Sequence, residues 1–422
     1  MVFPTYVAAA DTMFRANAEH TGVYENGGIE PTNTEVWRFP TGKWVGSSPM
    51  VSSGVVYVGS DDNNLYAIDA VSGKEKWRFM TGSRVASSPA VSDGIVYVGS
   101  SDNNLYAIDA VTGKEKWRLK TGNMIYSSPA VSNGIVYVGS SDNNLYAIGA
   151  VTGKEMWRFK TGSYVDSSPS VSNGVVYVGS FDKNLYAIDA VTGKEMWRFK
   201  TANEVKSSPA VSNGIVYVGS YDSNLYAIDA VTGKEMWRFK TEGSVFSSSA
   251  VSNAIVYVGS RGNNLYAIDA VTGKEKWLFK TESMVESSPA VSNGVVYVES
   301  YDNNLYAIDA VTGIEKWKFY IGKDKIWFRL WEDGVGSSPA VSNGVVYAGS
   351  SDGNLYAVGV PTSQENTQTI APTRTLTPNR PAETNGESPP LWDRNILIYL
   401  ILLVFVVIFG ALLYDMYYKN KK

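Results

Sequence analysis

Short runs of apolar and aromatic residues alternate with turn-forming residues along most of the chain. In the copy at 127–161 these runs are "AVS", "GIVYVGS", "NLYAIG" and "KEMWRFK". They are rich in residues that favour strands, and none has the period of an amphipathic helix. Asn133-Gly134 between the first two runs suits a type I′ hairpin, and the "DAVTGK" of other copies suits an Asx-type turn that ends at a glycine with positive φ. The pattern predicts four short antiparallel strands.

The pattern repeats every forty residues, with eight tryptophans in register. Four antiparallel strands per repeat make one blade of a β-propeller. We therefore predict an all-β fold, an eight-bladed β-propeller of four-stranded antiparallel blades closed by an N-terminal strand. The repeated tryptophans are interpreted as structural contacts between blades and not as binding residues. They are Trp37, Trp77, Trp117, Trp157, Trp197, Trp237, Trp277 and Trp317.

The two ends of the repeat array complement each other. A tryptophan strand at about 34–40 precedes the first blade start at Ser47, and no such strand follows the last "NLYA" run at 354–357. Blade eight is therefore predicted to combine residues 337–360 with the strand at 34–40. This arrangement would close the ring and remove an exposed strand edge, and a linear solenoid would not require it.

The composition changes after residue 360. The next thirty-one residues are rich in Pro, Thr, Asn and Glu, which predicts a disordered stalk. The nineteen apolar residues Ile396–Tyr414 then predict a C-terminal transmembrane helix, because such a helix is about 28 Å long and a bilayer core is roughly 30 Å thick. The expected organisation is a lead-in segment at 1–33 with a candidate signal-peptide remnant at 1–10, the propeller at 34–360, the stalk at 361–391, the transmembrane helix with its flanks at 392–418, and a basic tail at 419–422.

The end of the chain suggests an orientation in the membrane. Lys419, Lys421 and Lys422 follow the apolar stretch, and the positive-inside rule assigns such a cluster to the cytoplasm. We therefore expect a single-pass protein of the cell membrane, with the lipid bilayer as one partner and the propeller on the extracellular side. Because little chain follows the helix, the alternative is a tail-anchored protein with a cytoplasmic propeller.

Composition and charge exclude several kinds of site. The formal net charge is −4 without a long run of one sign, so no nucleic-acid partner is expected. The absence of cysteine excludes disulfides, thiolate metal sites and cysteine nucleophiles. The single histidine, His20, lies in the lead-in segment, where a structural role is a simpler interpretation than a catalytic one.

The motif "YAIDAVTGKEKW", present at 66–77 with Ser72 in place of Thr, resembles the repeat of the pyrroloquinoline-quinone-like (PQQ-like) β-propeller family. The lead-in "MFRANAEHTGVY" at 13–24 also resembles the segment that precedes such propellers. The resemblance covers about residues 12–360. It implies membership of a family that includes quinone-dependent dehydrogenases and non-enzymatic scaffolds, such as the lipoprotein of the bacterial outer-membrane assembly machine.

The enzymatic branch of that family uses a disulfide of adjacent cysteines over the quinone, a calcium site and a catalytic aspartate. This chain has no cysteine, and its turn aspartates recur around the ring, so they cannot form one asymmetric active site. We interpret them as acceptors of turn hydrogen bonds, with calcium ligation as the alternative. We expect no enzyme activity, no catalytic residue, no metal site and no cofactor, PQQ included. The aspartates are exemplified by Asp102, Asp142 and Asp182 in one turn and by Asp69, Asp109 and Asp189 in another.

Comparison among the eight copies shows where identity is lost. The connection from the outer strand of one blade to the inner strand of the next varies, as does the loop between the second and third strands, whereas the "VSNG" and "DAVTGK" turns hardly change. Because the chain reverses at each turn, both varied connections must lie on one face, here called the variable face, and both uniform turns on the opposite, constant face.

The variable face is the candidate binding surface. Unconstrained exposed positions would favour small polar residues, whereas large aromatic side chains are typical of recognition surfaces. The alternative is that these positions are simply exposed and free to vary. The candidate ligand-binding residues in the repeated loops are Trp44, Tyr126, Tyr164, Phe181, Tyr221, Phe246 and Tyr301.

One connection is longer than the others. Trp317 to Ser337 spans twenty residues, where Trp277 to Ser287 spans ten, and the additional sequence lies within "IGKDKIWFRLWEDG" at 321–334. Its large side chains are expected to contact a ligand, or alternatively to fold over the channel as a plug. These candidate residues are Trp327, Phe328, Arg329 and Trp331.

Together these features predict a membrane-anchored surface propeller that acts as a non-catalytic binding module for a protein or glycan partner. A structural scaffold or assembly factor in a cell-envelope complex is the alternative, and a quinone-dependent dehydrogenase is a more distant one.

Overall fold

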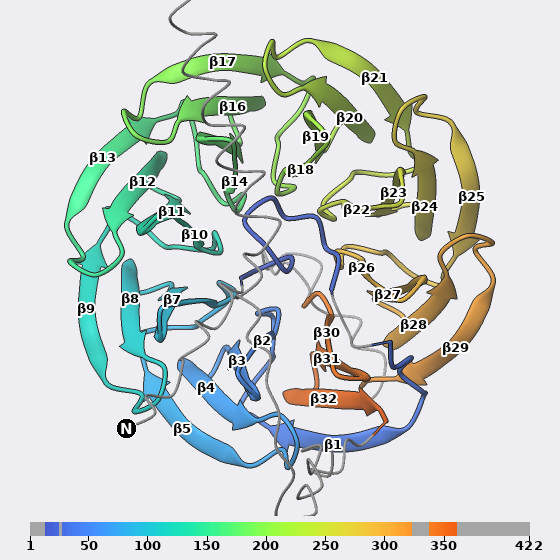
Figure 1. Ribbon diagram of the computed structural model, residues 1–422, viewed down its shortest axis with the longest axis horizontal. Coiled ribbons are helices and arrows are strands. Elements are labelled where there is room, and N and C mark those ends of the chain that lie inside the picture. The colour runs from blue at the N-terminus through green and yellow to red at the C-terminus, as the bar shows by residue number, and fades with distance from the viewer. Residues whose placement is uncertain (1–12, 25–27, 323–336, 361–422) are drawn as a thin grey trace, which may run out of the picture. The chain divides into compact units, whose positions relative to one another are not determined.

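The computed structural model describes residues 13–24, 28–322 and 337–360. Within them, 32 strands form eight four-stranded antiparallel sheets that radiate from a central channel (Figure 1). The predicted eight-bladed propeller is therefore confirmed. No helix long and apolar enough to cross a membrane occurs in these ranges. The predicted stalk, transmembrane helix and basic tail lie outside them.

The blades share one order from the channel outward. Blade one consists of β2 (Met50–Ser52), β3 (Val55–Gly59), β4 (Asn64–Asp69) and β5 (Glu75–Met80). Blade two consists of β6 (Ala90–Ser92), β7 (Ile95–Gly99), β8 (Asn104–Asp109) and β9 (Glu115–Lys120). Blade three consists of β10 (Ala130–Ser132), β11 (Ile135–Ser140), β12 (Asn144–Gly149) and β13 (Glu155–Lys160). Blade four consists of β14 (Ser170–Ser172), β15 (Val175–Gly179), β16 (Asn184–Asp189) and β17 (Glu195–Lys200). Blade five consists of β18 (Ala210–Ser212), β19 (Ile215–Gly219), β20 (Asn224–Asp229) and β21 (Glu235–Lys240). Blade six consists of β22 (Ala250–Ser252), β23 (Ile255–Ser260), β24 (Asn264–Asp269) and β25 (Glu275–Lys280). Blade seven consists of β26 (Ala290–Ser292), β27 (Val295–Glu299), β28 (Asn304–Asp309) and β29 (Glu315–Tyr320).

Blade eight is built from both ends of the domain. Its strands β30 (Ala340–Ser342), β31 (Val345–Gly349) and β32 (Asn354–Gly359) are completed by β1 (Glu35–Pro40), which pairs antiparallel with β32. The predicted closure is confirmed, and the outer edge of β32 is paired instead of open.

The turns follow the predicted local chemistry. Asn133 and Gly134 both have positive φ, 51° and 72°, as a type I′ hairpin requires. At the turn between the third and fourth strands of blade two, Oδ1 of Asp109 accepts hydrogen bonds from the backbone N–H and the hydroxyl of Thr112, each at 2.9 Å, and Gly113 follows with φ of 69°. Each repeat therefore specifies its own hairpins.

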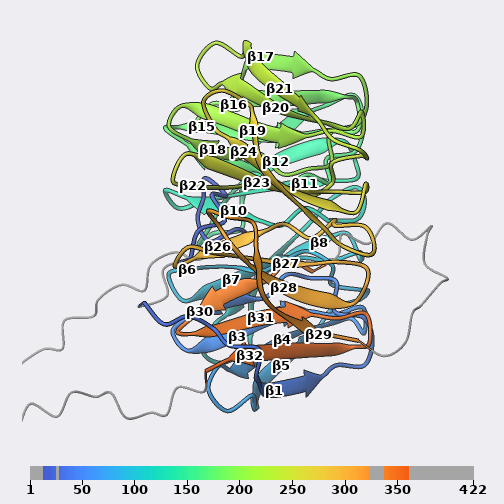
Figure 2. The ribbon, with the colours of Figure 1, turned by 90° about the vertical axis from the view of Figure 1, so that its right-hand side faces the viewer.

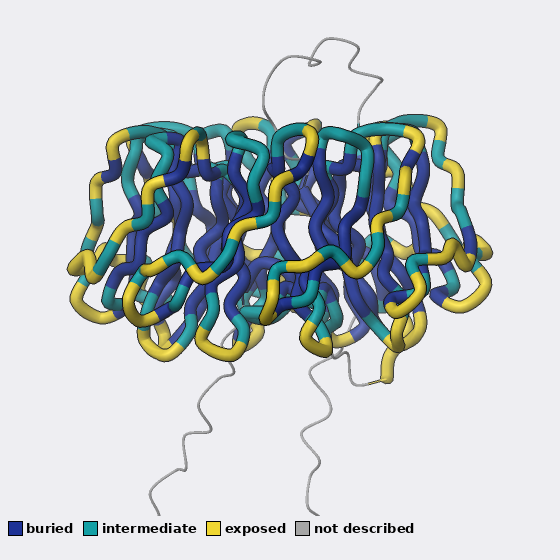
Figure 3. The backbone as a smooth tube through the Cα atoms, turned by 90° about the horizontal axis from the view of Figure 1, so that it is seen from above, coloured by how far each residue is buried: buried dark blue, intermediate teal, exposed yellow. Residues whose placement is uncertain are grey.

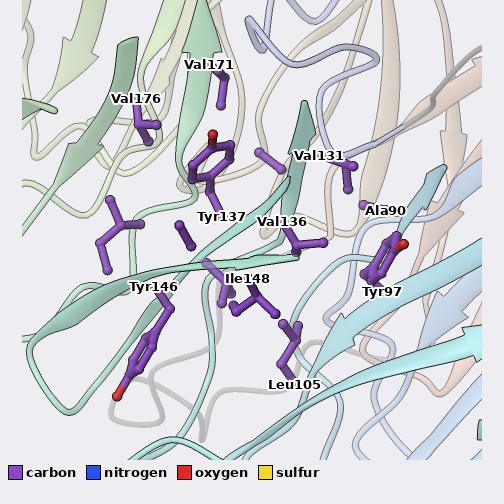
Figure 4. Packing of buried hydrophobic residues seen from close by; sticks show 14 of the residues in the cluster. Ala90, Tyr97, Leu105, Val131, Val136, Tyr137, Tyr146, Ile148, Val171 and Val176 are labelled. Atoms are coloured by element: carbon purple, nitrogen blue, oxygen red, sulfur yellow. The ribbon is translucent and has the colours of Figure 1, made fainter. Parts of the chain in front are cut away.

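The core lies between adjacent blades. Figure 4 shows Tyr137, Val136 and Ile148 packed with neighbouring apolar side chains, and all three are buried. The hydroxyl of Tyr137 and the indole N–H of Trp157 both donate to the carbonyl of Ala190 in the next blade, each at 3.1 Å. The equivalent tyrosine and tryptophan pair recurs in every blade. Blade seven lacks the shared acceptor, because the hydroxyl of Tyr297 has no hydrogen-bond partner in the described part of the chain and Trp317 donates to the carbonyl of Pro31 at 3.0 Å. Figure 2 shows the ring from its side, and Figure 3, also a side view, shows buried residues along the inner strands and exposed residues mainly at the turns.

Residues 13–24 of the lead-in segment cross the centre of the ring, as the dark blue trace in Figure 1 shows. Their carbonyl groups accept hydrogen bonds from inner-strand amides of four successive blades at 2.7 to 2.8 Å. Since each donor lies next to a constant turn, the lead-in segment covers the channel near the constant face. The donor and acceptor pairs are Val171 to Ala18, Val211 to Glu19, Val251 to Thr21 and Val291 to Gly22.

Arg15 fixes this segment from within the channel. Its guanidinium donates to the carbonyls of Pro289 and Ser249 at 2.5 and 2.6 Å, and burial lowers its pKa to about 10. His20 is fully buried, and burial together with the nearby charge of Arg15 lowers its pKa to about 3. A neutral imidazole packed edge-on against Phe14 is in keeping with the structural role expected for His20.

Candidate functional site

In blades one to seven, a backbone hydrogen bond joins the two varied connections. The amide of Phe181 donates to the carbonyl of Tyr164 at 3.0 Å, and that of Tyr301 donates to Met284 at 2.9 Å. The same bond recurs around the ring, for example from Ser101 to Arg84. Both connections therefore lie side by side on one face, as the strand reversals predicted.

Four of the candidate aromatic residues form a continuous row on blades four to six. The ring centroids of Tyr164 and Phe181 are 6.0 Å apart, and those of Phe181 and Tyr221 are also 6.0 Å apart. Tyr221 then stacks on Phe246 with a centroid distance of 4.0 Å and an interplanar angle of 25°. These four residues are called the aromatic row below.

A charged group extends the row towards blade seven. The guanidinium carbon of Arg261 lies 3.7 Å from the ring centroid of Phe246, and its Nε bonds to Oε1 of Glu286 at 2.5 Å. The hydroxyl of Tyr301 donates to Oε2 of the same carboxylate at 3.0 Å. Burial of this hydroxyl, and then the charge of Glu286, raise the pKa of Tyr301. The Glu286 side chain is nearly buried, with 4% exposed, so its two partners hold it in place.

The arrangement is fixed but open to solvent. Tyr164 is 49% exposed and Tyr301 is 42% exposed, even though the hydroxyl of Tyr301 is directed onto Glu286. Rings that are already held by neighbours lose little freedom when a partner binds. The row can stack against apolar or planar groups, and Arg261, with 44% of its side chain exposed, adds a hydrogen-bond donor at one end.

Other predicted residues lie apart from this row. Tyr126 belongs to a separate group, in which Nη2 of Arg84 donates to its hydroxyl at 2.6 Å and its hydroxyl contacts the sulfur of Met124 at 3.1 Å. Trp44 lies against Gly46. The residues of the long connection, Trp327, Phe328, Arg329 and Trp331, lie outside the described residues.

Sequence reasoning missed Glu299 on β27. The other seven blades have glycine at this position, so the departure "YVES" from "YVGS" was the available signal. A side chain would collide there in a regular blade, because a Cβ on Gly59 would lie 2.4 Å from the carbonyl oxygen of Val85 in the following connection. In blade seven the following connection is the long one. The exceptional residue and the exceptional connection therefore occur at the same joint.

Glu299 borders a cavity of about 70 Å³ between blades seven and eight. Its side chain is buried, with the residue only 7% exposed, and Oε1 has no hydrogen-bond partner in the described part of the chain. Burial raises the pKa of its carboxyl well above the ordinary 4.5, and a hydrogen bond with Ser337 opposes that rise. The wall also includes Ser287, Ser300, Tyr301 and Trp44. We call this space the seam cavity.

Within residues 13–24, 28–322 and 337–360, no three His, Cys, Asp or Glu side chains are grouped so that they could hold a metal ion.

The fold and the repeat define the class of protein: an eight-bladed propeller of PQQ-like repeats with one face of varied loops. More specifically, the chain belongs to the family described as outer membrane protein assembly factor BamB, which matches residues 27–158, 124–202, 145–255 and 232–385. This match confirms the family resemblance of the repeat. No curated protein sequence matches the chain.

Three solved structures show the same fold. The computationally designed Ika8 protein has 19% identity and a TM-score of 0.68, with 78% of this chain and 100% of that chain covered. BamB from Moraxella catarrhalis has 17% identity and a TM-score of 0.66, with coverage of 78% and 99%. A europium-containing methanol dehydrogenase has 15% identity and a TM-score of 0.66, with coverage of 84% and 98%. At these identities the likeness concerns the fold alone and does not choose between a scaffold and an enzyme.

Proposed function

We propose that this protein is a membrane-anchored, non-catalytic binding module that engages a protein or glycan partner through its variable face. The observation that carries the proposal is the aromatic row, extended by Arg261, Glu286 and Tyr301. Aromatic residues and arginine contribute much of the energy at known recognition surfaces. Here they come from loops that differ between otherwise uniform blades, so the fold itself does not require them.

The repeated aspartates support a non-catalytic role because each is already engaged by its own blade. Asp102 accepts hydrogen bonds from the hydroxyl of Tyr106 at 2.6 Å and from the amide of Gly82 at 2.7 Å. Asp109 is engaged by its own turn through Thr112. A general base or a metal ligand would need to give up these partners before it could act.

Membrane anchorage is supported by the sequence of the C-terminal region. The apolar stretch 396–414 is long enough for one span, and the lysines after it favour a cytoplasmic end. We propose that the propeller is extracellular and linked through the stalk at 361–391. A cytoplasmic, tail-anchored propeller is the alternative. Protease added to intact cells should cut within the stalk if the propeller is extracellular, and only after lysis if it is cytoplasmic.

The second candidate is a scaffold or assembly factor in a cell-envelope complex. It is favoured by the family match and by a ring of exposed apolar side chains on the constant face, one in each "DAVTGK" turn. Such a ring could contact another protein with several blades at once. The most exposed members are Val111, Val151, Val191, Val231, Val271 and Val311, which are 68% to 85% exposed.

Face-specific variants of the full-length protein in detergent test the proposal. Binding should be measured on a glycan array and by cross-linking in the native membrane, followed by mass spectrometry. Replacing Tyr221 and Phe246 together by Ala should remove the glycan signal or the cross-links, with a loss in affinity of on the order of 2 kcal/mol or more. The matched control replaces Lys114 and Lys194 by Gln on the constant face and should change nothing. The opposite pattern would favour the scaffold.

A further inference from the structure

The seam cavity contains Glu299, which replaces the β-strand glycine found at this position in the other seven blades. The backbone at this position is unchanged, because the amide of Glu299 donates to Oγ of Ser287 at 3.2 Å, as that of Gly259 donates to Ser247 at 3.1 Å. The replacement therefore adds a carboxyl group to a strand that keeps the backbone hydrogen bond of the other blades. A strand residue chosen only for packing would not place an acid there, since burial of an unpaired carboxylate is costly.

The chemistry of the wall indicates what the carboxyl could bind. Oε1 of Glu299 has no hydrogen-bond partner in the described part of the chain, and Ser287, Ser300 and Ser337 line the same space. Carboxyl and hydroxyl oxygens can both accept hydrogen bonds. The rings of Tyr301 and Trp44 also border the cavity and offer contact to a cation or to methylene groups.

Size and charge restrict the ligand further. The cavity of about 70 Å³, counted as the space open to the centre of a water molecule, exceeds the roughly 10–15 Å³ that one water requires, so it has room for a small polar group such as an aminomethyl end. A divalent cation normally takes several carboxylate or carbonyl ligands, whereas the described residues of the wall include a single carboxyl group. An ammonium group is compact and has three N–H donors for the available acceptors.

We propose that the seam cavity binds a primary ammonium group at the end of a short methylene chain, with Glu299 as its counter-ion. The ammonium comes either from a lysine side chain of a partner protein or from a free small amine. The inference rests on the proposed function only in that the cavity belongs to the variable face. Burial favours the neutral carboxyl before binding, and a proton released on binding passes to the solvent while the ammonium retains its own protons.

Calorimetric titration of the full-length protein in detergent tests this site with defined probes. The probes are n-butylammonium and Nα-acetyl-lysine methylamide, with n-butanol as the neutral analogue and butyltrimethylammonium as the cation whose head is too large. The two primary amines should bind at least tenfold more tightly than either control. Binding should release up to one proton, seen as a heat that depends on the ionisation enthalpy of the buffer. Tighter binding of the lysine derivative would identify a partner protein as the source, and tighter binding of butylammonium a free amine.

Two variants of the same residue complete the test. Glu299→Gln keeps the shape of the side chain, and Glu299→Gly restores the residue of the other seven blades. Both should lose tenfold or more in affinity for the amines and release no proton, while circular dichroism shows an unchanged fold. Equal affinity in these variants, equal binding of n-butanol, or the absence of binding and proton release in the parent protein would overturn the proposal.

The proposed function can fail separately from this inference. The Tyr221→Ala and Phe246→Ala double variant should keep amine binding, because neither residue borders the cavity. Its loss of partner binding tests the aromatic row alone.

Discussion

At the scale of single residues, the same position can be compared among blades that have different residues there. The "DAVTGK" turn has an aspartate in most blades, but blade three has Gly149 at that position. In the regular turn, Asp109 accepts two hydrogen bonds from Thr112. In blade three this acceptor is missing, although the backbone bond from Gly153 to Gly149 is retained at 2.8 Å. The turn therefore has the regular geometry without its usual side-chain hydrogen bonds.

The first prediction follows from this difference. Gly149→Asp should raise the free energy of unfolding by about 0.5–1 kcal/mol, because it restores the turn hydrogen bonds and reduces the freedom of the unfolded chain. The Thr152 hydroxyl, 2.6 Å from the expected Cβ, can rotate towards the new carboxylate as its counterpart does in blade two. Denaturant unfolding measures the change. Gly149→Ala is the control for the entropic part, and a destabilised Asp variant would contradict the account.

Residue-level prediction from sequence succeeded where the cause is local. Asn133-Gly134 specifies its turn by its own conformational preferences, so no partner had to be known. Prediction from sequence was incomplete where a residue's partner comes from another blade. Glu286 meets Arg261 across a joint, and Tyr126 is drawn to Arg84 and away from the aromatic row. Such pairs depend on side-chain directions that the alternation of strands does not determine.

At the scale of single elements, the loops between the second and third strands depend on a carboxylate. Burial raises the pKa of Asp102, but hydrogen bonds from Tyr106, Gly82 and Asn104 outweigh it, and the pKa lies below the ordinary 3.8. In the "DAVTGK" turns, the amide and hydroxyl of Thr272 lower the pKa of Asp269 to about 2. Both turns are therefore stabilised by the ionised form of the acid.

The second prediction concerns acid stability. A carboxyl group whose pKa is lower in the folded than in the unfolded state contributes stability above its unfolded pKa, and the contribution disappears as the pH falls through the folded value. For these turns the window runs from about pH 4 down to about pH 2. The melting temperature should be nearly constant from pH 7 to pH 5 and fall by at least about 5 °C by pH 2.5. Circular dichroism melts would reveal a flat profile if the turns do not depend on charge.

The third prediction concerns the lead-in segment as an element. Arg15→Met should lower the free energy of unfolding by about 2–3 kcal/mol, because the carbonyls of Pro289 and Ser249 would lose charged donors inside the channel. Arg38→Met on the outer strand is the control, since its ion pair with Glu35 is exposed and such pairs contribute little. Equal effects of the two changes would show that the lead-in segment does not stabilise the ring.

At the scale of the whole molecule, the ring of blades is nearly symmetric, and two features depart from that symmetry. The lead-in segment bonds to the inner strands of blades four to seven, and Glu299 marks the joint between blades seven and eight. The eight blades and their closure could be predicted because the repeat length and the unmatched strands are visible in the sequence. The course of residues 13–24 through the channel could not, because it depends on backbone bonds to strands more than 150 residues away.

The last prediction separates closure of the ring from coverage of the channel. Removal of residues 1–27 eliminates the bonds of the lead-in segment but leaves β1 paired with β32. This variant should melt at a lower temperature yet elute in detergent as the parent protein does, without aggregates. Removal of residues 1–42 also exposes the edge of β32 and removes Trp37, which packs on Tyr347 of blade eight and donates to Ala70 of blade one. Because an open apolar strand edge pairs readily with other chains, the second variant should aggregate or lose cooperative unfolding. Size-exclusion chromatography and thermal melts distinguish the two, and identical behaviour would mean that β1 is not the element that holds the ring closed.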